Sequence, residues 1–187
     1  MQDKDPIVRA EKAFEFRDTI AQVWNPGGIV PGTQLDRMVG LKRARVNLIR
    51  LTPGSTAFPY HTRHCEEEWI YVLQGQGVVE IDGAEHLIGV GDFVGFTAPS
   101  VPHQLRNPFN RSLVCLVGGE RAEIDIADFP RLGKRMFRRG DHMEVYDTAD
   151  AEEIAPADFD EYMTQSYRRS MNAAKTPPNR KETPDGD

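Results

Sequence analysis

The sequence predicts an all-β domain, an antiparallel sandwich or barrel, and the spacing of its short strands is the main reason. Runs of apolar, β-branched and aromatic residues recur between about residues 44 and 119, and Gly, Pro or Asp-Gly turns separate them. No repeat has the period of a solenoid or propeller. A chain of 187 residues is long enough for one such domain with an extension at each end.

The first elements follow from composition and alternation. Residues 1–40 are polar at first and then rich in Gly and Pro, which predicts an N-terminal extension that packs on the barrel. The barrel itself is expected over residues 41–120. Its strands are predicted at 44–51, 69–73, 78–81, 84–88, 92–96 and 112–119, with Asp82-Gly83 as a two-residue hairpin turn.

Beyond the barrel the pattern changes, and residues 121–174 are expected to form a C-terminal extension. A helix is predicted at about 156–172, because Pro156 suits a first helical turn and apolar residues then recur every four positions. That apolar stripe indicates a packing face and consists of Phe159, Met163, Tyr167 and Met171. Residues 175–187 have the composition of a disordered tail.

Charge and composition exclude several classes of protein. The formal net charge of -6 gives no reason to expect nucleic-acid binding. No apolar run reaches the length of a membrane span, and the first residues lack the apolar core of a signal peptide. Cys65 and Cys115 are too few for a disulfide framework, so a reduced, cytoplasmic setting is expected. Cys65 itself is predicted to be a small buried residue.

One short stretch carries most of the chemistry. His61, His64 and the three carboxylates 66–68 fall within eight residues, directly before the apolar run 69–73. A second stretch, 91–107, ends near the isolated His103. Imidazoles and a carboxylate at the mouth of a rigid strand are suitable ligands for a divalent first-row metal ion.

These two stretches resemble the two sequence motifs of the cupin superfamily. The first motif reads G-x5-H-x-H-x3-4-E-x6-G, and His64, Glu68 and Gly75 match its second half. The first half departs from it, with six residues between Gly54 and His61 and with the pair spaced H-x-x-H. The second motif, G-x5-P-x-G-x2-H-x3-N, is matched loosely by Gly91, Pro99, Pro102, His103 and Asn107, without the inner glycine. The resemblance implies a double-stranded β-helix, or jelly-roll barrel, around one metal centre.

The ligand set that this resemblance implies is His61, His64, Glu68 and His103. Strand parity places His64 and Glu68 on the inner face but turns His61 outward and Thr62 inward. Two interpretations therefore stay open. Either a bulge re-aims His61 into the barrel, or Thr62 takes its position and the centre is incomplete. His86 and His142 have no partner at ligand spacing and are predicted to lie on the surface.

The expected cofactor is one divalent ion, with Fe, Mn, Ni and Zn all compatible with the ligands. Tyr60, Thr62 and Arg50 are candidates for contacts with a small-molecule ligand. Three functions remain open: a metal-dependent enzyme such as a dioxygenase, isomerase or decarboxylase acting on a small polar or anionic metabolite, a non-catalytic binding or sensing barrel with a degenerate metal site, and a structural module.

Parity also predicts that Trp69 and Tyr71 face outward. Two large aromatic side chains on an outer face indicate a covered surface. Together with the apolar stripe of the predicted C-terminal helix, they lead us to expect a homodimer.

Overall fold

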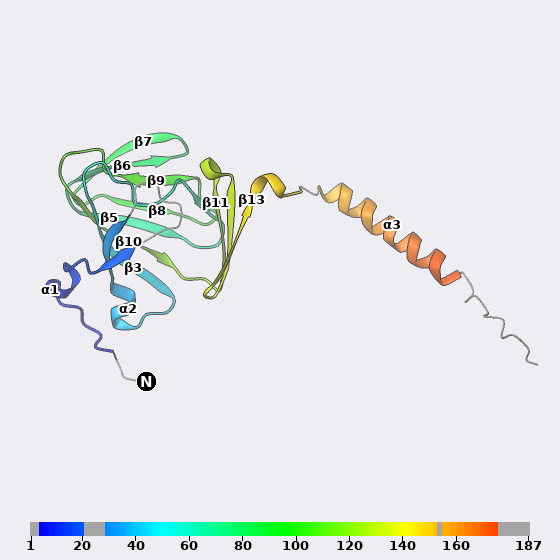
Figure 1. Cartoon of the computed structure of the whole chain (residues 1–187), viewed down its shortest axis with the longest axis horizontal. Helices are drawn as coiled ribbons and strands as arrows, with labels where there is room; N and C mark the ends of the chain where they lie inside the picture. The colour runs from blue at the N-terminus through cyan, green and yellow to red at the C-terminus, as the bar shows by residue number, and fades with distance from the viewer. Residues whose placement is uncertain (1–3, 21–28, 153–154, 176–187) are drawn as a thin grey trace, which may run out of the picture. The chain divides into compact units, whose positions relative to one another are not determined.

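The computed structural model describes residues 4–20, 29–152 and 155–175. Contacts divide the chain into two units, residues 1–149 and 150–187, and all the strands belong to the first (Figure 1). The expected tail 175–187 lies, apart from Lys175, outside the described residues.

Antiparallel sheets make up the first unit. The largest has six strands in the order β1-β2-β3-β10-β5-β8, which span Asp18–Ile20, Val30–Gln34, Ala44–Leu51, Leu113–Glu120, Glu68–Gln74 and Phe93–Phe96. A three-stranded sheet, β7-β6-β9, consists of Ala84–Gly89, Gln76–Ile81 and His103–Arg106. A four-stranded sheet, β13-β12-β11-β4, consists of His142–Asp147, Lys134–Arg139, Ile124–Phe129 and Thr62–Arg63.

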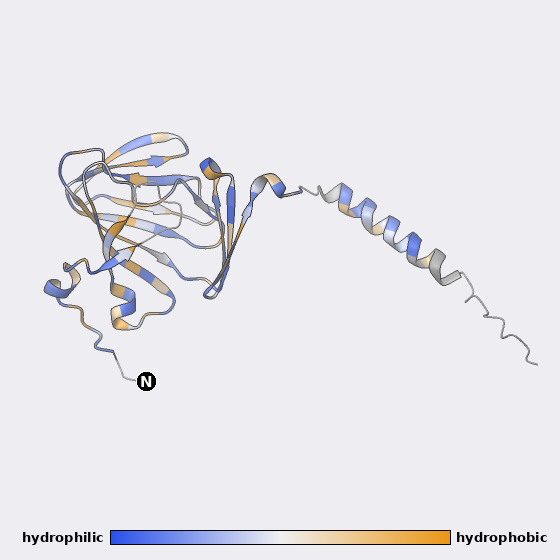
Figure 2. Ribbon diagram, viewed as in Figure 1, coloured by the Kyte–Doolittle hydropathy of each residue, from blue (hydrophilic) through white to orange (hydrophobic). Residues whose placement is uncertain are grey.

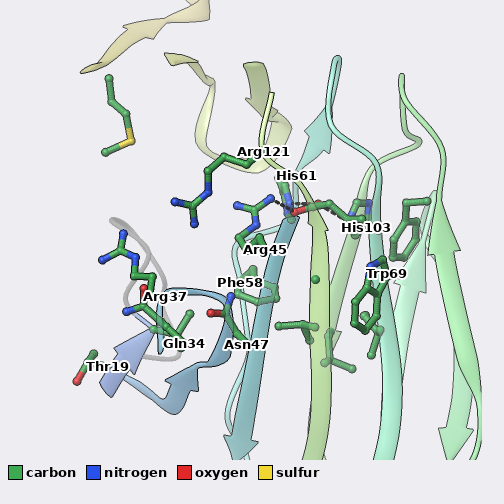
Figure 3. Close-up of a pocket in the computed structure, with 18 residues that line it drawn as sticks. Thr19, Gln34, Arg37, Arg45, Asn47, Phe58, His61, Trp69, His103 and Arg121 are labelled. Atoms are coloured by element: carbon green, nitrogen blue, oxygen red, sulfur yellow. Dashed lines mark hydrogen bonds and ion pairs between the residues drawn. The ribbon is translucent and has the colours of Figure 1, made fainter. Parts of the chain in front are cut away.

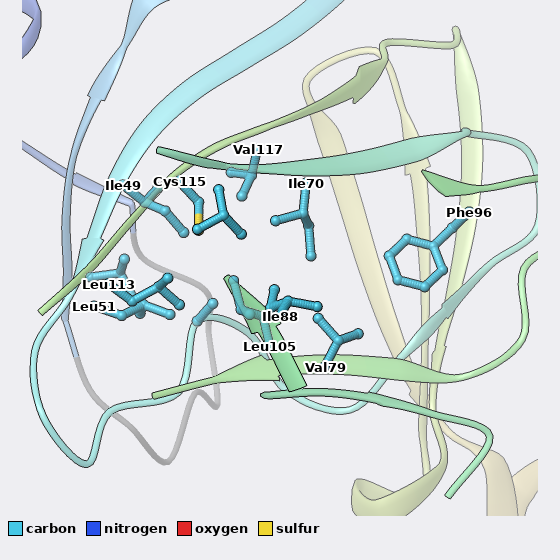
Figure 4. Close-up of a cluster of buried hydrophobic side chains, with 13 residues drawn as sticks. Ile49, Leu51, Ile70, Val79, Ile88, Phe96, Leu105, Leu113, Cys115 and Val117 are labelled. Atoms are coloured by element: carbon cyan, nitrogen blue, oxygen red, sulfur yellow. The ribbon is translucent and has the colours of Figure 1, made fainter. Parts of the chain in front are cut away.

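Alternate residues of the six-stranded sheet build the core between it and the three-stranded sheet (Figure 4). Ile49 of β3 and Val72 of β5 both lie beside Cys115 of β10, and all three are at most 1% exposed. The period-two pattern of these strands puts one apolar face toward the core. Val79 and Leu105 of the opposite sheet complete the packing, so the predicted jelly-roll barrel is confirmed.

Two turns show why the chain reverses where it does. Asp82 and Gly83 both have positive φ, 48° and 79°, as the tight hairpin between β6 and β7 requires. Gly75 has φ 82° between β5 and β6, and a Cβ there would lie 2.4 Å from the carbonyl oxygen of Ser112. The last glycine of the first motif is therefore required by backbone conformation and by close approach.

The meander β11-β12-β13 lies where the sequence pattern predicted only a C-terminal extension. Strand β12, KRMFRR, is dominated by cationic residues and does not show the apolar alternation of a core strand. It forms because the flanking strands supply its hydrogen bonds on both edges. Strand β11 also pairs with the short strand β4, and this pairing places the meander next to His61 and His64.

The described residues contain few helical segments. They comprise α1 (Ala10–Ala13), α2 (Leu35–Val39), the 3-10 turns η1 (Pro130–Leu132) and η2 (Thr148–Asp150), and α3 (Pro156–Lys175). Helix α3 is mainly hydrophilic with apolar positions at intervals (Figure 2), and Phe159, Met163, Tyr167 and Met171 are all exposed. Among the described residues, no helix combines the length and apolar character needed to cross a membrane.

The outer face of β5 and β8 carries aromatic side chains. Trp69 stacks against Phe93 with ring centroids 6.3 Å apart, and Tyr71 is 38% exposed. Cys65 is exposed, so the prediction of a buried cysteine at that position is wrong. The chain bends away from strand geometry there, between β4 and β5.

Candidate metal centre

Three side chains converge at one end of the core. Nε2 of His61 lies 3.1 Å from Oε2 of Glu68, and Nε2 of His103 lies 3.4 Å from the same oxygen (Figure 3). The two histidines are 2% and 5% exposed. The three ligand atoms lie within 4.8 Å of one another.

Backbone pairing places the two histidines side by side. His61 N–H donates to the His103 carbonyl at 3.1 Å, and His103 N–H donates to the His61 carbonyl at 2.8 Å. This bridge pairs His61, the residue just before β4, with His103, the first residue of β9. Glu68 is the first residue of β5, so its side chain reaches the pair from the adjacent sheet.

Hydrogen bonds at the far side of each ring decide which nitrogen carries the proton. Nδ1 of His61 lies 2.9 Å from the Pro59 carbonyl oxygen, and Nδ1 of His103 lies 3.0 Å from that of Val101. A carbonyl oxygen can only accept, so each Nδ1 carries a proton, and Nε2 is the nitrogen of each ring that faces Glu68. Burial also lowers the pKa of His61, which favours its neutral form.

Glu68 faces these two Nε2 atoms as a carboxylate. Burial opposes its ionisation, but the contacts with His103 and His61 and the charge of Arg63 together hold its pKa well below the ordinary value. Three atoms able to bind a metal ion therefore lie around one small volume. Two ligands held at about 2.1 Å from an ion and separated by 90–109° lie roughly 3.0–3.4 Å apart, and the two separations from Glu68 Oε2, 3.1 and 3.4 Å, fall in this range.

The other oxygen of Glu68 is held by arginines. Oε1 lies 2.9 Å from Nε of Arg63 and 3.3 Å from Nη2 of Arg45. Because the arginines contact Oε1, the other carboxylate oxygen, Oε2, is oriented toward the two histidines. Residues that orient a ligand in this way tune a metal site, and their loss typically lowers metal affinity by about 10–100-fold.

A buried ion network supports this arrangement. Arg63 is 5% exposed and also contacts Glu66 at 3.3 Å and Asp125 at 2.5 Å. Arg138 contacts Glu66 from β12, and Arg45 contacts it from β3 at 2.9 Å. Glu66 and Asp125 are at most 1% exposed. The meander that sequence analysis missed thus contributes two of the charges behind the site.

His64, predicted as a ligand, is not brought to this cluster. Its Nε2 lies 2.9 Å from Oδ2 of Asp128, and its side chain is 37% exposed. Strand parity would relate His61, His64 and Glu68 only if one continuous strand ran through residues 60–72. Strand β4 instead ends at Arg63, and β5 begins only at Glu68, so parity does not carry across residues 64–67.

The structure also shifts the alignment with the first cupin motif. The inward histidine is His61, the pair reads His61-x-Arg63, and four residues separate Arg63 from Glu68. A guanidinium thus stands where the motif has its second histidine. The alternative in which Thr62 replaces His61 is not what the structure shows: Thr62 donates to the carbonyl oxygen of Ser100 instead.

A cavity of about 370 Å³ opens onto the three ligands. Its described lining combines apolar side chains, amides and arginines, and it includes Phe58, Ile70, Leu105, Val117, Gln34, Asn47, Arg37, Arg45 and Arg121. Tyr60, Thr62 and Arg50 are not among the lining residues. Tyr60 lies under the guanidinium of Arg131, and Arg50 stacks on Phe16.

Some of the missed residues had a signal in the sequence. On the strand 44–51 the odd positions share a face, and Ile49 and Leu51 are core residues, so Arg45 and Asn47 point inward with them. By the same parity, Arg50 lies on the opposite face of the strand from Arg45 and Asn47, away from the cavity. Arg37 and Arg121 follow only from the tertiary fold, because they lie in a short helix and in the loop after β10.

Comparison with known proteins agrees with this architecture. A family model described as "Cupin domain" matches residues 47–119. A structure from Acidithiobacillus ferrooxidans, provisionally described as a sugar phosphate isomerase, has 32% identity and a TM-score of 0.75, and the match covers 80% of this chain and 96% of that one. The chain belongs to the cupin superfamily.

Other solved structures are more distant. A sugar phosphate isomerase of the cupin superfamily from Silicibacter pomeroyi has 25% identity and a TM-score of 0.61, with 66% of this chain and 80% of that one covered. A predicted oxalate decarboxylase from Thermotoga maritima has 24% identity and a TM-score of 0.49, with 56% of this chain and 91% of that one covered. A search of curated proteins found no match.

Proposed function

We propose that this protein binds one divalent first-row metal ion through Nε2 of His61, Nε2 of His103 and Oε2 of Glu68, and binds a small polar or anionic metabolite beside it. The observation that carries the proposal is the convergence of three atoms able to bind a metal ion. With each Nδ1 already bonded to a carbonyl oxygen, Nε2 is the nitrogen of each ring left to bind an ion, and the Glu68 carboxylate adds a negative charge between the two rings. This donor set suits a divalent first-row cation.

Two imidazoles and one carboxylate leave coordination positions open for a ligand. Such a centre supplies Lewis-acid polarisation of a bound oxygen or, with Fe(II), dioxygen chemistry. Fe, Mn, Ni and Zn all accept this donor set. Around it, the chain's own residues orient Glu68 and line a cavity whose volume, about 370 Å³, is at the small end of the range for metabolite sites.

Sugar phosphate isomerisation is the first reaction to assay, because the A. ferrooxidans protein with 32% identity is provisionally given that activity. One observation favours the non-catalytic alternative. Among the described lining residues, no titratable side chain other than the three ligands and the arginines is present to act as a general base. An enzyme would therefore have to use its ligand set for proton transfer, whereas a binding protein needs no base.

Metal content of matched variants tests the centre. Protein purified without chelator should contain about one equivalent of metal, and His61→Ala, His103→Ala and Glu68→Gln should each lose most of it. His64→Ala is the matched control, since it removes a nearby imidazole that pairs with Asp128 instead. Elemental analysis that finds equal metal in all variants, or as large a loss in His64→Ala, would refute the proposed ligand set.

Turnover separates the two functions. Sugar phosphates incubated with metal-loaded protein and followed by NMR should isomerise if the protein is an enzyme, and Glu68→Gln should abolish the reaction. Binding of the same compounds by calorimetry without any conversion would favour the non-catalytic barrel.

A further inference from the structure

Three arginines lie along the cavity beside the candidate metal centre. Arg37 comes from α2, Arg45 from β3, and Arg121 from the loop after β10, and Figure 3 shows their guanidinium groups on one side of the cavity. The only acidic side chain among the described lining residues is Glu68. The chain as a whole carries a net charge of -6, so this local excess of positive charge is not a general property of its surface.

Each of the three guanidinium groups keeps hydrogen-bond donors available. Nη2 of Arg121 lies 3.1 Å from Oδ2 of Asp36, whose side chain is 1% exposed, and this contact fixes the orientation of Arg121. Arg45 contacts Glu66 and Glu68 through Nη2 alone. Arg37 makes no ion pair with any residue in the described part of the chain, although its guanidinium lines the cavity.

Neutral donors stand beside these charges. The amides of Gln34 and Asn47 line the same part of the cavity, and Asn47 is 8% exposed. Arginine presents its donors in a planar fork that suits bidentate contacts with phosphate or carboxylate oxygens. A carboxylate has one negative charge and two oxygens, so a single guanidinium group can pair with both oxygens. A phosphate monoester has nearly two charges and three terminal oxygens, which matches several guanidinium groups.

We propose that Arg37, Arg45 and Arg121 form a subsite for the phosphate monoester of a small metabolite. This inference rests on the proposed function, because the remaining oxygen atoms of that metabolite would lie at the His61, Glu68 and His103 centre. The ligand is thus a phosphorylated small molecule with hydroxyl or carbonyl oxygens, held by charge at one end and by the metal ion at the other. A neutral sugar would leave the arginine end without a partner.

Calorimetry on the full-length, metal-loaded protein tests the subsite with ribose 5-phosphate, ribose and inorganic phosphate as probes. Ribose 5-phosphate should bind at least about tenfold more tightly than ribose. Arg37→Gln should weaken ribose 5-phosphate binding by at least about tenfold and leave metal content unchanged. Arg9→Gln, which removes an exposed arginine outside the cavity, is the matched control and should bind as the wild type does.

Arg121 needs a paired substitution, because its loss alone would leave the buried Asp36 without its partner. The double variant Asp36→Asn, Arg121→Gln removes both charges and should also weaken binding by at least about tenfold. Equal affinity of wild type and Arg37→Gln for ribose 5-phosphate would overturn the subsite, and so would equal affinity of the wild type for ribose and ribose 5-phosphate.

Inorganic phosphate distinguishes this inference from the proposed metal centre. Chelator-treated protein should still bind phosphate, and Arg37→Gln should reduce that binding, since the arginines do not depend on the metal ion. If the protein binds no metal but binds phosphate in a way that depends on Arg37, the metal centre is contradicted and the subsite is not. If the protein contains one equivalent of metal but Arg37→Gln binds ribose 5-phosphate and inorganic phosphate as tightly as the wild type, the subsite is contradicted and the metal centre is not.

Discussion

Replacing Arg63 by Met should destabilise the protein strongly, because it removes the cation at the centre of the buried ion network. Arg63 is 5% exposed and contacts Glu66, Glu68 and Asp125. Of these, Asp125 is 0% exposed, and among the described residues the only other hydrogen bond to its carboxylate comes from the backbone N–H of Cys65 at 3.3 Å. Arg63→Met leaves that carboxylate buried with no cation.

The magnitude follows from this burial. Breaking a buried ion pair by removing one partner costs about 3–5 kcal/mol, since the remaining charge stays desolvated. For a domain of this size, roughly 2–4 °C of melting temperature corresponds to each kcal/mol, so a decrease of about 10 °C is expected. Arg63→Met with Asp125→Asn removes both charges and should recover part of the loss.

Urea unfolding of chelator-treated protein, followed by tryptophan fluorescence, measures the free energy of unfolding without a contribution from metal binding. Arg135→Met is the matched control. Arg135 pairs with Asp128 at 2.6 Å but is 49% exposed, and exposed pairs contribute at most about 1 kcal/mol. If Arg63→Met costs no more than Arg135→Met, the network does not contribute to stability as argued.

Three further predictions concern reactivity, pH and assembly. A thiol reagent at pH 8 should label Cys65 in the folded protein but label Cys115 only after unfolding. Cys65 is exposed, whereas burial raises the pKa of the Cys115 thiol to about 12. Rapid labelling of both cysteines in the folded protein would contradict this prediction. Glu68 has a folded-state pKa below its unfolded value, so its contribution to the stability of metal-free protein is present above about pH 4.3 and is lost as the pH falls through the folded pKa. Glu68→Gln should therefore show a shallower loss of unfolding free energy between about pH 5 and 3 than the wild type, and parallel curves would contradict the assignment. Analytical ultracentrifugation should give a homodimer, and Phe93→Asp on the exposed aromatic face should give a monomer; a wild-type monomer would show that these aromatics do not form an interface.

The sequence by itself determined the barrel and most of its strands. The predicted strand 44–51 coincides with β3, and Asp82-Gly83 forms the hairpin turn between β6 and β7. These elements are specified locally, since alternation defines one buried face and a two-residue turn with positive φ defines the reversal. Asn107 of the second motif is explained only in part locally, because its amide donates to the carbonyl oxygen of Arg111, four residues on, and also to that of Leu51, 56 residues earlier.

Only the tertiary structure decided which histidines meet. Parity holds within a strand, and the chain leaves strand geometry between Arg63 and Glu68, so the sequence left His61 ambiguous and placed His64 wrongly. The backbone bridge from His61 to His103 joins residues 42 positions apart, and no local pattern encodes it. Arg121 likewise reaches the cavity through its contact with Asp36, 85 residues earlier in the chain. Long-range pairings of this kind bring together groups whose sequence neighbours carry no trace of the contact, and they set the composition of the site.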